Sequence, residues 1–377
     1  MGLLAVLTAI ITAAHPVIRV DQTWLQGPTW LDGWIQFDST WYYAIATQGY
    51  FYIPGQQSSI AFFPTYPLFV RALTALTGDA QIAGMLITAT AGAGALTLFA
   101  VWASRRLPRR AAVTSVLVLL LYPYSFFLYG TMYADAMFLL TVIAAFVLLE
   151  RRHPVLAGLV GVLATAGRPV GIALLVGLAV RAWEIRVSQT TQDPDRRLSL
   201  RALVGGWRTL RRSDFGVFIS ALGLASWCAY LWLTYGDPLA FVAVESAPGW
   251  DQGSGPRTWF KISLIELIMQ GSFRIVAVLL VQGLVCLTAV LLLHRVWKRF
   301  GWGYLAYSVV GLVIPILGSK DFMGCGRYVL AAFPVFAAAG DALVGSRYRW
   351  LRPLVLVVSS VGLLVGTLFY ARGYEVS

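Results

Sequence analysis

The sequence predicts an all-α integral membrane protein, a polytopic helical bundle of about eleven transmembrane helices. Hydrophobic residues make up 58% of the 377 residues and charged residues only 12%. Apolar runs of membrane-spanning length recur from one end of the chain to the other, and a soluble chain would need more charge to cover its surface. The net charge of +12 does not indicate nucleic-acid binding, because the arginines lie between the apolar runs rather than on one basic domain.

The N-terminal part combines one expected membrane helix with a polar region. Residues 2–20 are apolar and have no basic residue before Arg19, so we expect a membrane helix rather than a signal peptide. Residues 60–77 are apolar but contain Pro64, Pro67 and Arg71, which predicts an interfacial or re-entrant helix. Further spans are expected at 80–103, 111–129, 134–149, 215–235, 273–293, 303–317, 328–344 and 353–370.

The stretch 154–183 does not fit a single upright span. Its 30 residues would form a helix of roughly 45 Å, too long for one crossing and too short for two full ones. Basic residues flank both ends. We therefore expect two short helices that meet at Gly167-Arg168-Pro169, with Arg168 at the turn.

Charge predicts the orientation of the single transmembrane domain, residues 1–377. The basic loops all fall on one side if the spans alternate, and the positive-inside rule makes that side cytoplasmic. We expect the N-terminus inside and the C-terminus outside, with 21–79 and 235–272 as the large outer loops and 186–214 as a basic cytoplasmic loop. The basic loops are 105–110, 151–152, 181–212, 295–299 and 347–352.

The polar, aromatic stretch 36–50, QFDSTWYYAIATQGY, is the first candidate site. It holds one carboxylate, Asp38, with Trp41, Tyr42 and Tyr50 close by. A carboxylate among aromatic side chains suits a site for a sugar or a lipid head group. The alternative is a surface helix with an ordinary acidic residue at its start.

Cationic side chains on the expected outer side form a candidate phosphate site. Arg168, Lys320 and Arg327 together would neutralise a phosphate, and the forked guanidinium donors are well suited to one. The alternatives are a structural ion pair or snorkelling side chain for Arg168, an interfacial anchor for Arg327, and a solvated pair of Lys320 with Asp321. Tyr133 and Asp135, in the turn YGTMYADA, are candidate substrate-binding residues.

The cysteines and histidines indicate neither a disulfide framework nor a zinc site. Cys228, Cys286 and Cys325 are widely spaced, and the three histidines are scattered. Two protein cations can balance the single phosphate of a lipid-phosphate donor. We therefore expect no cofactor and no divalent metal.

Several motifs resemble one family in the same order. FDSTWYYAIATQGY followed by AFFPTYPLFVRAL resembles the paired signature of the GPI mannosyltransferase II (PIG-V-like) family of GT-C membrane glycosyltransferases. YPYSFFLYGTMYADAMFLL, AGLVGVLATAGRPVGIAL, YGDPLAF and GRYVLAAFPVFA are also similar to it. The resemblance implies a catalytic Asp38 in the first outer loop. It also implies inverting transfer of a sugar, typically mannose, from a polyprenyl-phosphate donor to a lipid-linked or cell-envelope acceptor.

The chain departs from the family pattern at two positions. Phe37 stands where the family more often has Trp, and Asp135 stands where Glu is usual. Both departures leave the sugar open. We expect a multi-pass protein of a bacterial cytoplasmic membrane with its active site outside.

Two other functions fit the same hydropathy. A transporter or flippase of a glycolipid or lipid-linked sugar would favour broken helices at corresponding places in two halves and polar residues at the midplane. The polar groups here cluster on one face and in the outer loops, which disfavours transport. A non-catalytic lipid-binding scaffold is the third possibility, and replacing Asp38 with Asn separates it from an enzyme.

Overall fold

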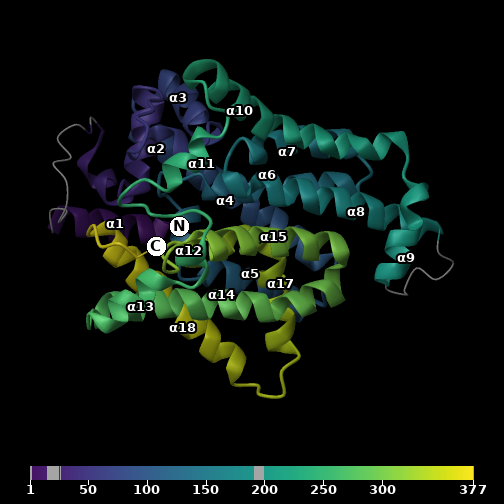
Figure 1. Cartoon of the computed structure of the whole chain (residues 1–377). Helices are drawn as coiled ribbons and strands as arrows, with labels where there is room; N and C mark the ends of the chain where they lie inside the picture. Colours follow the sequence, from purple (N-terminus) through teal and green to yellow (C-terminus); the bar gives the residue numbers. More distant parts are fainter. Residues whose placement is uncertain (1, 15–24, 26, 191–198, 377) are drawn as a thin grey trace.

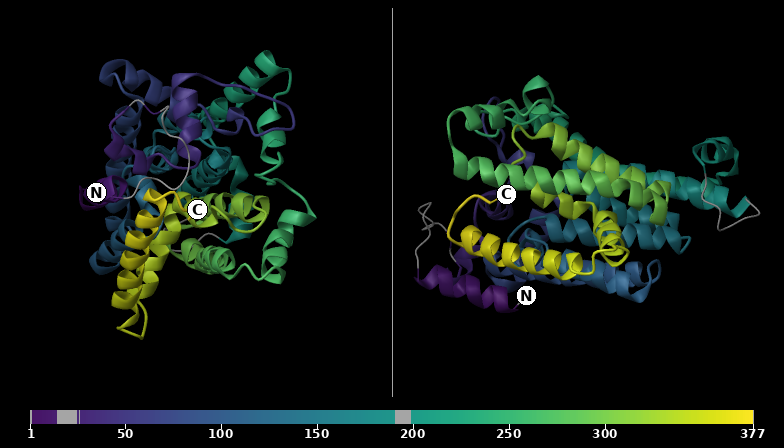
Figure 2. Two further views of the ribbon diagram at one scale, coloured as in Figure 1. Left: turned by 90° about the vertical axis from the view of Figure 1, so that its left-hand side faces the viewer. Right: turned by 90° about the horizontal axis from the view of Figure 1, so that it is seen from below.

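The computed structural model describes residues 2–14, 25, 27–190 and 199–376. The described residues form helices and loops without a strand. Long helices run side by side, with the short helices α2, α3 and α11 at one end of the bundle and α9 at the other (Figure 1). We call these the α2 end and the α9 end. A view from below shows the same separation (Figure 2).

The first half of the chain runs from α1 to α8. Its elements are α1 (Gly2–Ala14), η1 (Thr29–Trp34), α2 (Asp38–Thr47), η2 (Ser59–Ala61), α3 (Thr65–Thr77), α4 (Ala80–Ser104), α5 (Arg109–Leu121), η3 (Ser125–Leu128), α6 (Asp135–Glu150), α7 (Pro154–Thr165), η4 (Pro169–Gly171) and α8 (Ile172–Thr190).

The second half starts at the α9 end and finishes at the α2 end. Its elements are α9 (Leu200–Gly205), η5 (Gly206–Thr209), η6 (Arg212–Ser220), α10 (Ala221–Tyr235), α11 (Ala240–Glu245), α12 (Pro256–Trp259), α13 (Ile262–Met269), α14 (Phe273–Phe300), α15 (Trp302–Gly318), α16 (Cys325–Tyr328), η7 (Val329–Ala331), α17 (Phe333–Val344) and α18 (Leu351–Ala371).

Four helical segments of the described chain are long and apolar enough to cross a membrane. They are Ala80–Ser104, Arg212–Tyr235, Phe273–Phe300 and Leu351–Ala371, and a bent pair between Cys325 and Val344 would be a fifth. These helices support a membrane protein. The total of about eleven spans stays a prediction, as does the part of the first expected span that lies in residues 15–20, outside the described residues.

Local sequence sets where α3 ends and α4 begins. Gly78 follows α3 with a φ of 74°, a left-handed conformation that glycine adopts without steric cost. Asp79 then accepts a hydrogen bond from the backbone N–H of Ile82 at 2.8 Å, which satisfies a free donor in the first turn of α4. The two helices therefore join through one sharp turn.

The expected break in 154–183 is confirmed. Helix α7 ends at Thr165, and α8 begins at Ile172 after the short η4. Arg168 lies between them in an extended conformation, with φ −158° and ψ 150°, as favoured before a proline. This extended residue carries its side chain into the protein interior, where Arg168 is 8% exposed.

Two expected single spans are wrong because prolines end or bend them. The stretch 111–129 is not one helix: α5 ends at Leu121 before Pro123, and η3 follows. The stretch 328–344 is bent by 90° between Cys325–Ala331 and Phe333–Val344. Pro334 lies in the first turn of α17, where its missing N–H breaks no helical hydrogen bond.

Buried charges tie the helices together at the α9 end. Glu150, the last residue of α6, accepts hydrogen bonds from Arg181 at 3.0 Å and from the hydroxyl of Tyr304 at 2.7 Å, and it also pairs with Arg106. Glu184 accepts from the backbone N–H of Trp302 at 2.9 Å, at the start of α15. This network joins the loop after α4 to α6, α8 and α15 at the end that carries several of the basic loops.

Replacing Gly92 with Ala should destabilise the bundle. A Cβ at this position of α4 would lie 1.9 Å from the backbone oxygen of Leu128, so the helix and η3 must move apart. We expect a loss of about 1–3 kcal/mol, seen as a lower thermal unfolding midpoint in detergent. Gly311→Ala is the matched control, because its Cβ would meet only the Cβ of Ala173 at 3.8 Å. Equal midpoints for the two variants would contradict this tight packing.

Candidate active site

Hydrogen bonds from distant parts of the chain fix the start of α2. The backbone N–H of Asp38 donates to the hydroxyl of Tyr133 at 3.1 Å, and that hydroxyl donates to the carbonyl of Gln36 at 3.2 Å. The hydroxyl of Tyr370 donates to the same carbonyl at 3.0 Å and lies 3.1 Å from the hydroxyl of Ser39. Asp38 is therefore positioned by the segment before α6 and by α18 as well as by its own helix.

Phe37, directly before Asp38, has a strained backbone. Its φ is 56° and its ψ is −121°, a conformation that bulky side chains rarely adopt. Such residues cost about 1–3 kcal/mol and persist only where their surroundings fix them. The Phe37 ring packs 5.8 Å from the ring of Tyr370, so the same tyrosine that fixes Gln36 also holds this turn.

The carboxylate of Asp38 forms an ion pair with Arg327. The Nη1 atom of Arg327 lies 2.9 Å from Oδ2 of Asp38. The Asp38 side chain is 32% exposed, whereas the Arg327 side chain is only 6% exposed. A ligand can thus reach the carboxylate, while the guanidinium supports it from the protein side.

Buried polar contacts fix α16, which carries Arg327. The backbone N–H of Gly326 donates to Oε1 of Gln282 at 3.0 Å, and its carbonyl accepts from the hydroxyl of Tyr122 at 2.6 Å. A side chain at Gly326 would collide with the ring of Tyr124, which lies 2.4 Å from the Cβ position. The four-residue helix α16 is therefore held from α14 and from the end of α5.

Aromatic rings surround the guanidinium of Arg327. Its central carbon lies 4.9 Å from the ring centroid of Tyr133, 5.0 Å from that of Tyr328 and 5.3 Å from that of Phe127. These contacts stabilise a cation away from water. Its buried Nε has no hydrogen-bond partner among the described residues, so one donor remains for an anion.

A second buried ion pair lies beside the first. Arg168, from the break between α7 and α8, pairs with Asp135 at the start of α6. The Arg168 guanidinium lies 5.1 Å from the ring centroid of Tyr328, the same ring that Arg327 contacts. One tyrosine ring therefore brings both guanidiniums together, each next to its own carboxylate.

Two of the candidate aromatic residues, Trp41 and Tyr42, lie in α2 with Asp38, and Tyr50 follows that helix. Trp41 stacks on Phe62, with centroids 5.7 Å apart and 17° between the planes, and meets the edge of Trp250 at 5.7 Å. Tyr42 is buried, at 7% exposed. The Tyr50 hydroxyl donates to the carbonyl of Phe62 at 2.9 Å. Trp41 is half-buried and is the best placed of these three to meet a ligand.

Lys320 lies in a different setting from the two arginines. Its ammonium is 3.1 Å from a carboxylate oxygen of Asp251, and its side chain is 25% exposed. The pairing lowers the pKa of Asp251. The Lys320–Asp321 pair weighed from the sequence is not formed, since Asp321 instead accepts from the backbone N–H of Met323 at 2.9 Å. The described contacts thus unite Asp38, Arg327, Arg168 and Asp135 but leave Lys320 in the loop between α15 and α16, paired with Asp251.

Sequence reasoning missed three residues that the structure brings to this site. The ring of Tyr328 lies against the guanidiniums of both Arg168 and Arg327. The Tyr370 hydroxyl donates to the carbonyl of Gln36, just before α2. Burial and the charge of Asp38 raise the pKa of Glu245. Tyr328 was within a quoted motif, GRYVLAAFPVFA, which could have pointed to it. Tyr370 has no local sequence signal, whereas Glu245 follows the motif YGDPLAF within the expected outer loop 235–272 but is not marked out from the other polar residues of that loop.

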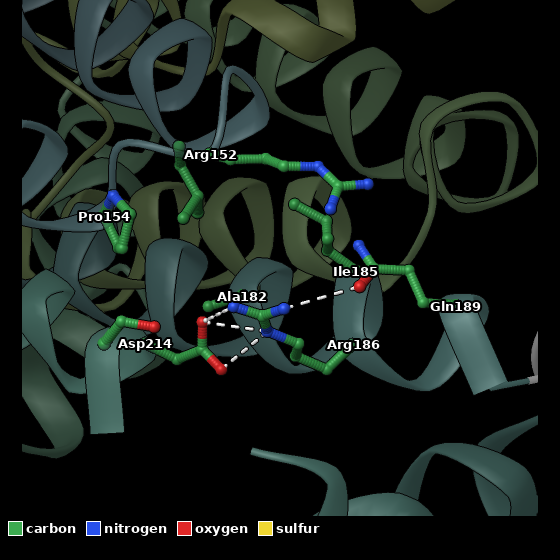
Figure 3. A pocket seen from close by; sticks show the side chains of 9 residues that line it. Arg152, Pro154, Ala182, Ile185, Arg186, Gln189 and Asp214 are labelled. Atoms are coloured by element: carbon green, nitrogen blue, oxygen red, sulfur yellow. Dashed lines mark hydrogen bonds and ion pairs between the residues drawn. The ribbon is translucent and has the colours of Figure 1, made fainter. Parts of the chain in front are cut away.

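A small pocket at the α9 end is separate from these residues. It is lined by Arg152, Arg186 and Asp214 among others (Figure 3). Arg186 donates to both carboxylate oxygens of Asp214, at 2.8–3.0 Å. This pairing joins α8 to η6 and leaves no free acid for chemistry there.

Metal binding is not apparent in the described part of the chain. No group of three or more His, Cys, Asp or Glu side chains there is arranged to hold a metal ion. Asp38 and Asp135 each face a guanidinium instead.

Comparisons with known proteins identify the fold. No family model matches the chain, and no curated protein matches it. It is similar to ArnT from Cupriavidus metallidurans bound to undecaprenyl phosphate, with a TM-score of 0.52 and 13% identity over 100% of this chain and 77% of that one. It also resembles the oligosaccharyltransferase of Archaeoglobus fulgidus in the apo form, with a TM-score of 0.45 and 12% identity over 99% of this chain and 56% of that one.

The similarity to ArnT defines the class of fold. The chain has the same helical fold as ArnT from Cupriavidus metallidurans. It spans about half the length of the archaeal oligosaccharyltransferase chain. A shared fold at this level of identity does not carry over an activity, which has to be argued from the site itself.

Removing Arg168 should destabilise the protein, because Asp135 would then be a buried carboxylate without its partner. We expect Arg168→Ala to lower the free energy of unfolding by about 3–5 kcal/mol. Adding Asp135→Asn should recover most of this loss, because the stranded charge is then gone. Thermal unfolding in detergent of the two single variants and the double variant measures the coupling. An additive double variant would show that the two side chains do not depend on each other.

Proposed function

We propose that the protein is a membrane glycosyltransferase that moves a sugar from a polyprenyl-phosphate donor to a hydroxyl acceptor. The observation that carries the proposal is the accessible Asp38 carboxylate held against the buried Arg327 guanidinium, with Arg168 close by. A base next to a cationic phosphate site is the combination that such a transfer needs. Its fold, shared with a structure bound to undecaprenyl phosphate, supports the same class of donor.

The reaction has three coupled changes in this proposal. The acceptor oxygen bonds to the anomeric carbon, the bond between that carbon and the phosphate oxygen breaks, and the acceptor proton passes to Asp38. The departing polyprenyl phosphate keeps the bonding electrons. Arg327 and Arg168 stabilise the negative charge that develops on it, where forked donors act best.

The stereochemistry should be inverting. A retaining route normally uses a carboxylate as nucleophile and a second carboxyl group as acid and base. Asp38 is the one carboxylate in the motif 36–50, and Asp135 is committed to Arg168. A single displacement with Asp38 as general base is therefore the simpler mechanism.

The finer assignments rest on the sequence motifs. Mannose as the sugar, a lipid-linked or cell-envelope acceptor, and an outward-facing site in a bacterial cytoplasmic membrane belong to the proposal through the PIG-V-like resemblance. Trp41, Tyr42, Tyr50 and Tyr133 would then line the substrate site around Asp38. Lys320 would join phosphate binding only by leaving Asp251, with which it forms an ion pair.

Replacing Asp38 tests the proposal most directly. We expect Asp38→Ala to lower kcat by about 10²–10⁴-fold, the usual contribution of a general base, while Asp38→Asn abolishes transfer without loss of expression. Purified enzyme in liposomes, assayed with polyprenyl-phosphate-mannose, gives the rates and the anomeric configuration of the product. Glu266→Gln, on the half-exposed α13, is the control. Near-normal turnover of Asp38→Ala, or retained configuration, would rule out this mechanism.

Arg327 should contribute through charge on the leaving phosphate. We expect Arg327→Ala to reduce kcat about 10²–10³-fold and Arg327→Lys to restore only part of it, because the lysine lacks the fork. The same liposome assay measures both variants. Full activity of Arg327→Lys would mean that charge alone, without bidentate geometry, is sufficient.

Activity should survive chelation of divalent metals. Each carboxylate at the site already faces a guanidinium, and a lipid-phosphate donor carries one phosphate that two arginines can balance. We expect the same rate before and after treatment with EDTA. Loss of activity that Mg²⁺ or Mn²⁺ restores would contradict this and make Asp135 a candidate ligand.

A further inference from the structure

The small cavity at the α9 end lies at the opposite end of the bundle from the candidate active site. It has a volume of about 70 Å³ and lies between the turn after α6, helix α8 and the start of η6. Figure 3 shows the side chain of Arg152 above the paired Arg186 and Asp214. Because one water needs roughly 10–15 Å³, the cavity has room for a group as large as a phosphate.

The acidic side chain in the lining of this cavity is already paired. Asp214 accepts hydrogen bonds from the Arg186 guanidinium at 2.8–3.0 Å and from the backbone N–H of Arg211 at 2.8 Å. Glu150 and Glu184, the acidic residues at this end of α6 and α8, belong to the charge network that joins these helices to α15. The lining therefore offers no unpaired carboxylate to a further cation.

Arg152 is a further cation in this lining. Its guanidinium has no partner among the described residues. Its backbone has a φ of 67°, the left-handed conformation with which the chain leaves α6. Glycine is the usual residue at such a position, since a side chain there costs backbone free energy. An arginine in this conformation, beside a cavity and without a contact inside the described chain, points to a partner outside the protein.

The cavity lies at a membrane boundary. Asp214 is in the first turn of Arg212–Tyr235, a segment long and apolar enough to cross a membrane. Exposed apolar side chains directly follow two of the lining residues: Val155 follows Pro154, and Phe215 follows Asp214. The cavity is therefore next to a surface on which acyl chains can lie, with its arginines at the level of the head groups.

We propose that this cavity binds the phosphate of an anionic phospholipid and that Arg152 donates to it. Forked guanidinium donors match the geometry of phosphate oxygens, and basic pockets between membrane helices suit anionic head groups. Arg151 and Arg212, the chain neighbours of two lining residues, add positive charge. The apolar surface favours a lipid over free phosphate, because acyl chains would cover Val155 and Phe215. This binding does not depend on the proposed transfer reaction.

Binding of short-chain lipids to the purified full chain tests this site. The probes are dioctanoyl phosphatidylglycerol, dioctanoyl phosphatidylcholine and inorganic phosphate, each titrated in an uncharged detergent while the thermal unfolding midpoint is followed. A ligand of the folded state raises the midpoint with its concentration, which yields a Kd. We expect phosphatidylglycerol to bind more tightly than phosphatidylcholine, which has no net charge, and more tightly than inorganic phosphate, which has no acyl chains.

Two variants of Arg152 separate lipid binding from stability. Arg152→Gln should weaken phosphatidylglycerol binding about fivefold, the usual contribution of one cationic side chain near an anionic lipid. Arg152→Gly should weaken it equally, yet without lipid it should melt no lower than the wild type, because glycine adopts a φ of 67° without strain. Arg349→Gln is the matched control. It removes an exposed arginine of the basic loop after α17, outside the cavity, and should leave the affinity unchanged.

The lipid site is overturned if phosphatidylglycerol leaves the midpoint of the wild type unchanged. Equal affinity for phosphatidylcholine or for inorganic phosphate would rule out an anionic lipid as the ligand. Wild-type affinity in Arg152→Gln and Arg152→Gly would rule out Arg152 as the donor. An equal loss in Arg349→Gln would mean that the charge of the whole basic face, rather than the cavity, attracts the lipid. Each of these results leaves transfer and its dependence on Asp38 untouched, so the proposed function stands or falls separately.

Discussion

The ion pair of Asp38 with Arg327 is the contact on which the arrangement of the α2 end depends. It joins the start of α2 to α16, two segments that are 289 residues apart in the chain. Hydrogen bonds fix the backbone on both sides of this contact. Tyr133 and Tyr370 bond to the backbone at and before Asp38. Gln282 and Tyr122 bond to the backbone of Gly326, next to Arg327. A strained Phe37 is tolerated between them because these contacts over-determine the turn.

Two paired arginines side by side are costly inside a membrane protein unless each charge is compensated. Here each guanidinium has a carboxylate and at least one aromatic ring. An incoming phosphate would find the two cations preorganised but partly neutralised. In the proposed reaction such a site would bind an anion by exchange of partners, because the phosphate would take over donors that pair with the carboxylates in the structure.

Sequence reasoning located the parts of the site that have a local signature. Asp38 stands out in an aromatic stretch, and the break at Arg168 follows from a helix length that does not fit a bilayer. The helix end before Pro123 and the 90° bend before α17 were missed, because hydropathy stays high across both. The Arg168–Asp135 pair and the approach of Glu245 to Asp38 depend on how distant segments pack, which composition and periodicity do not encode.

The separation of Asp38 from Arg327 along the chain also bears on biosynthesis. When α2 has been synthesised, the segment that carries Arg327 has not yet been made, and Tyr370 follows later still. The Asp38 carboxylate therefore has no Arg327 partner until α16 has been synthesised, and the turn at Phe37 gains its last support only with α18. A nascent chain has no assembled site, so the order of synthesis delays any chemistry until almost the whole protein is in place.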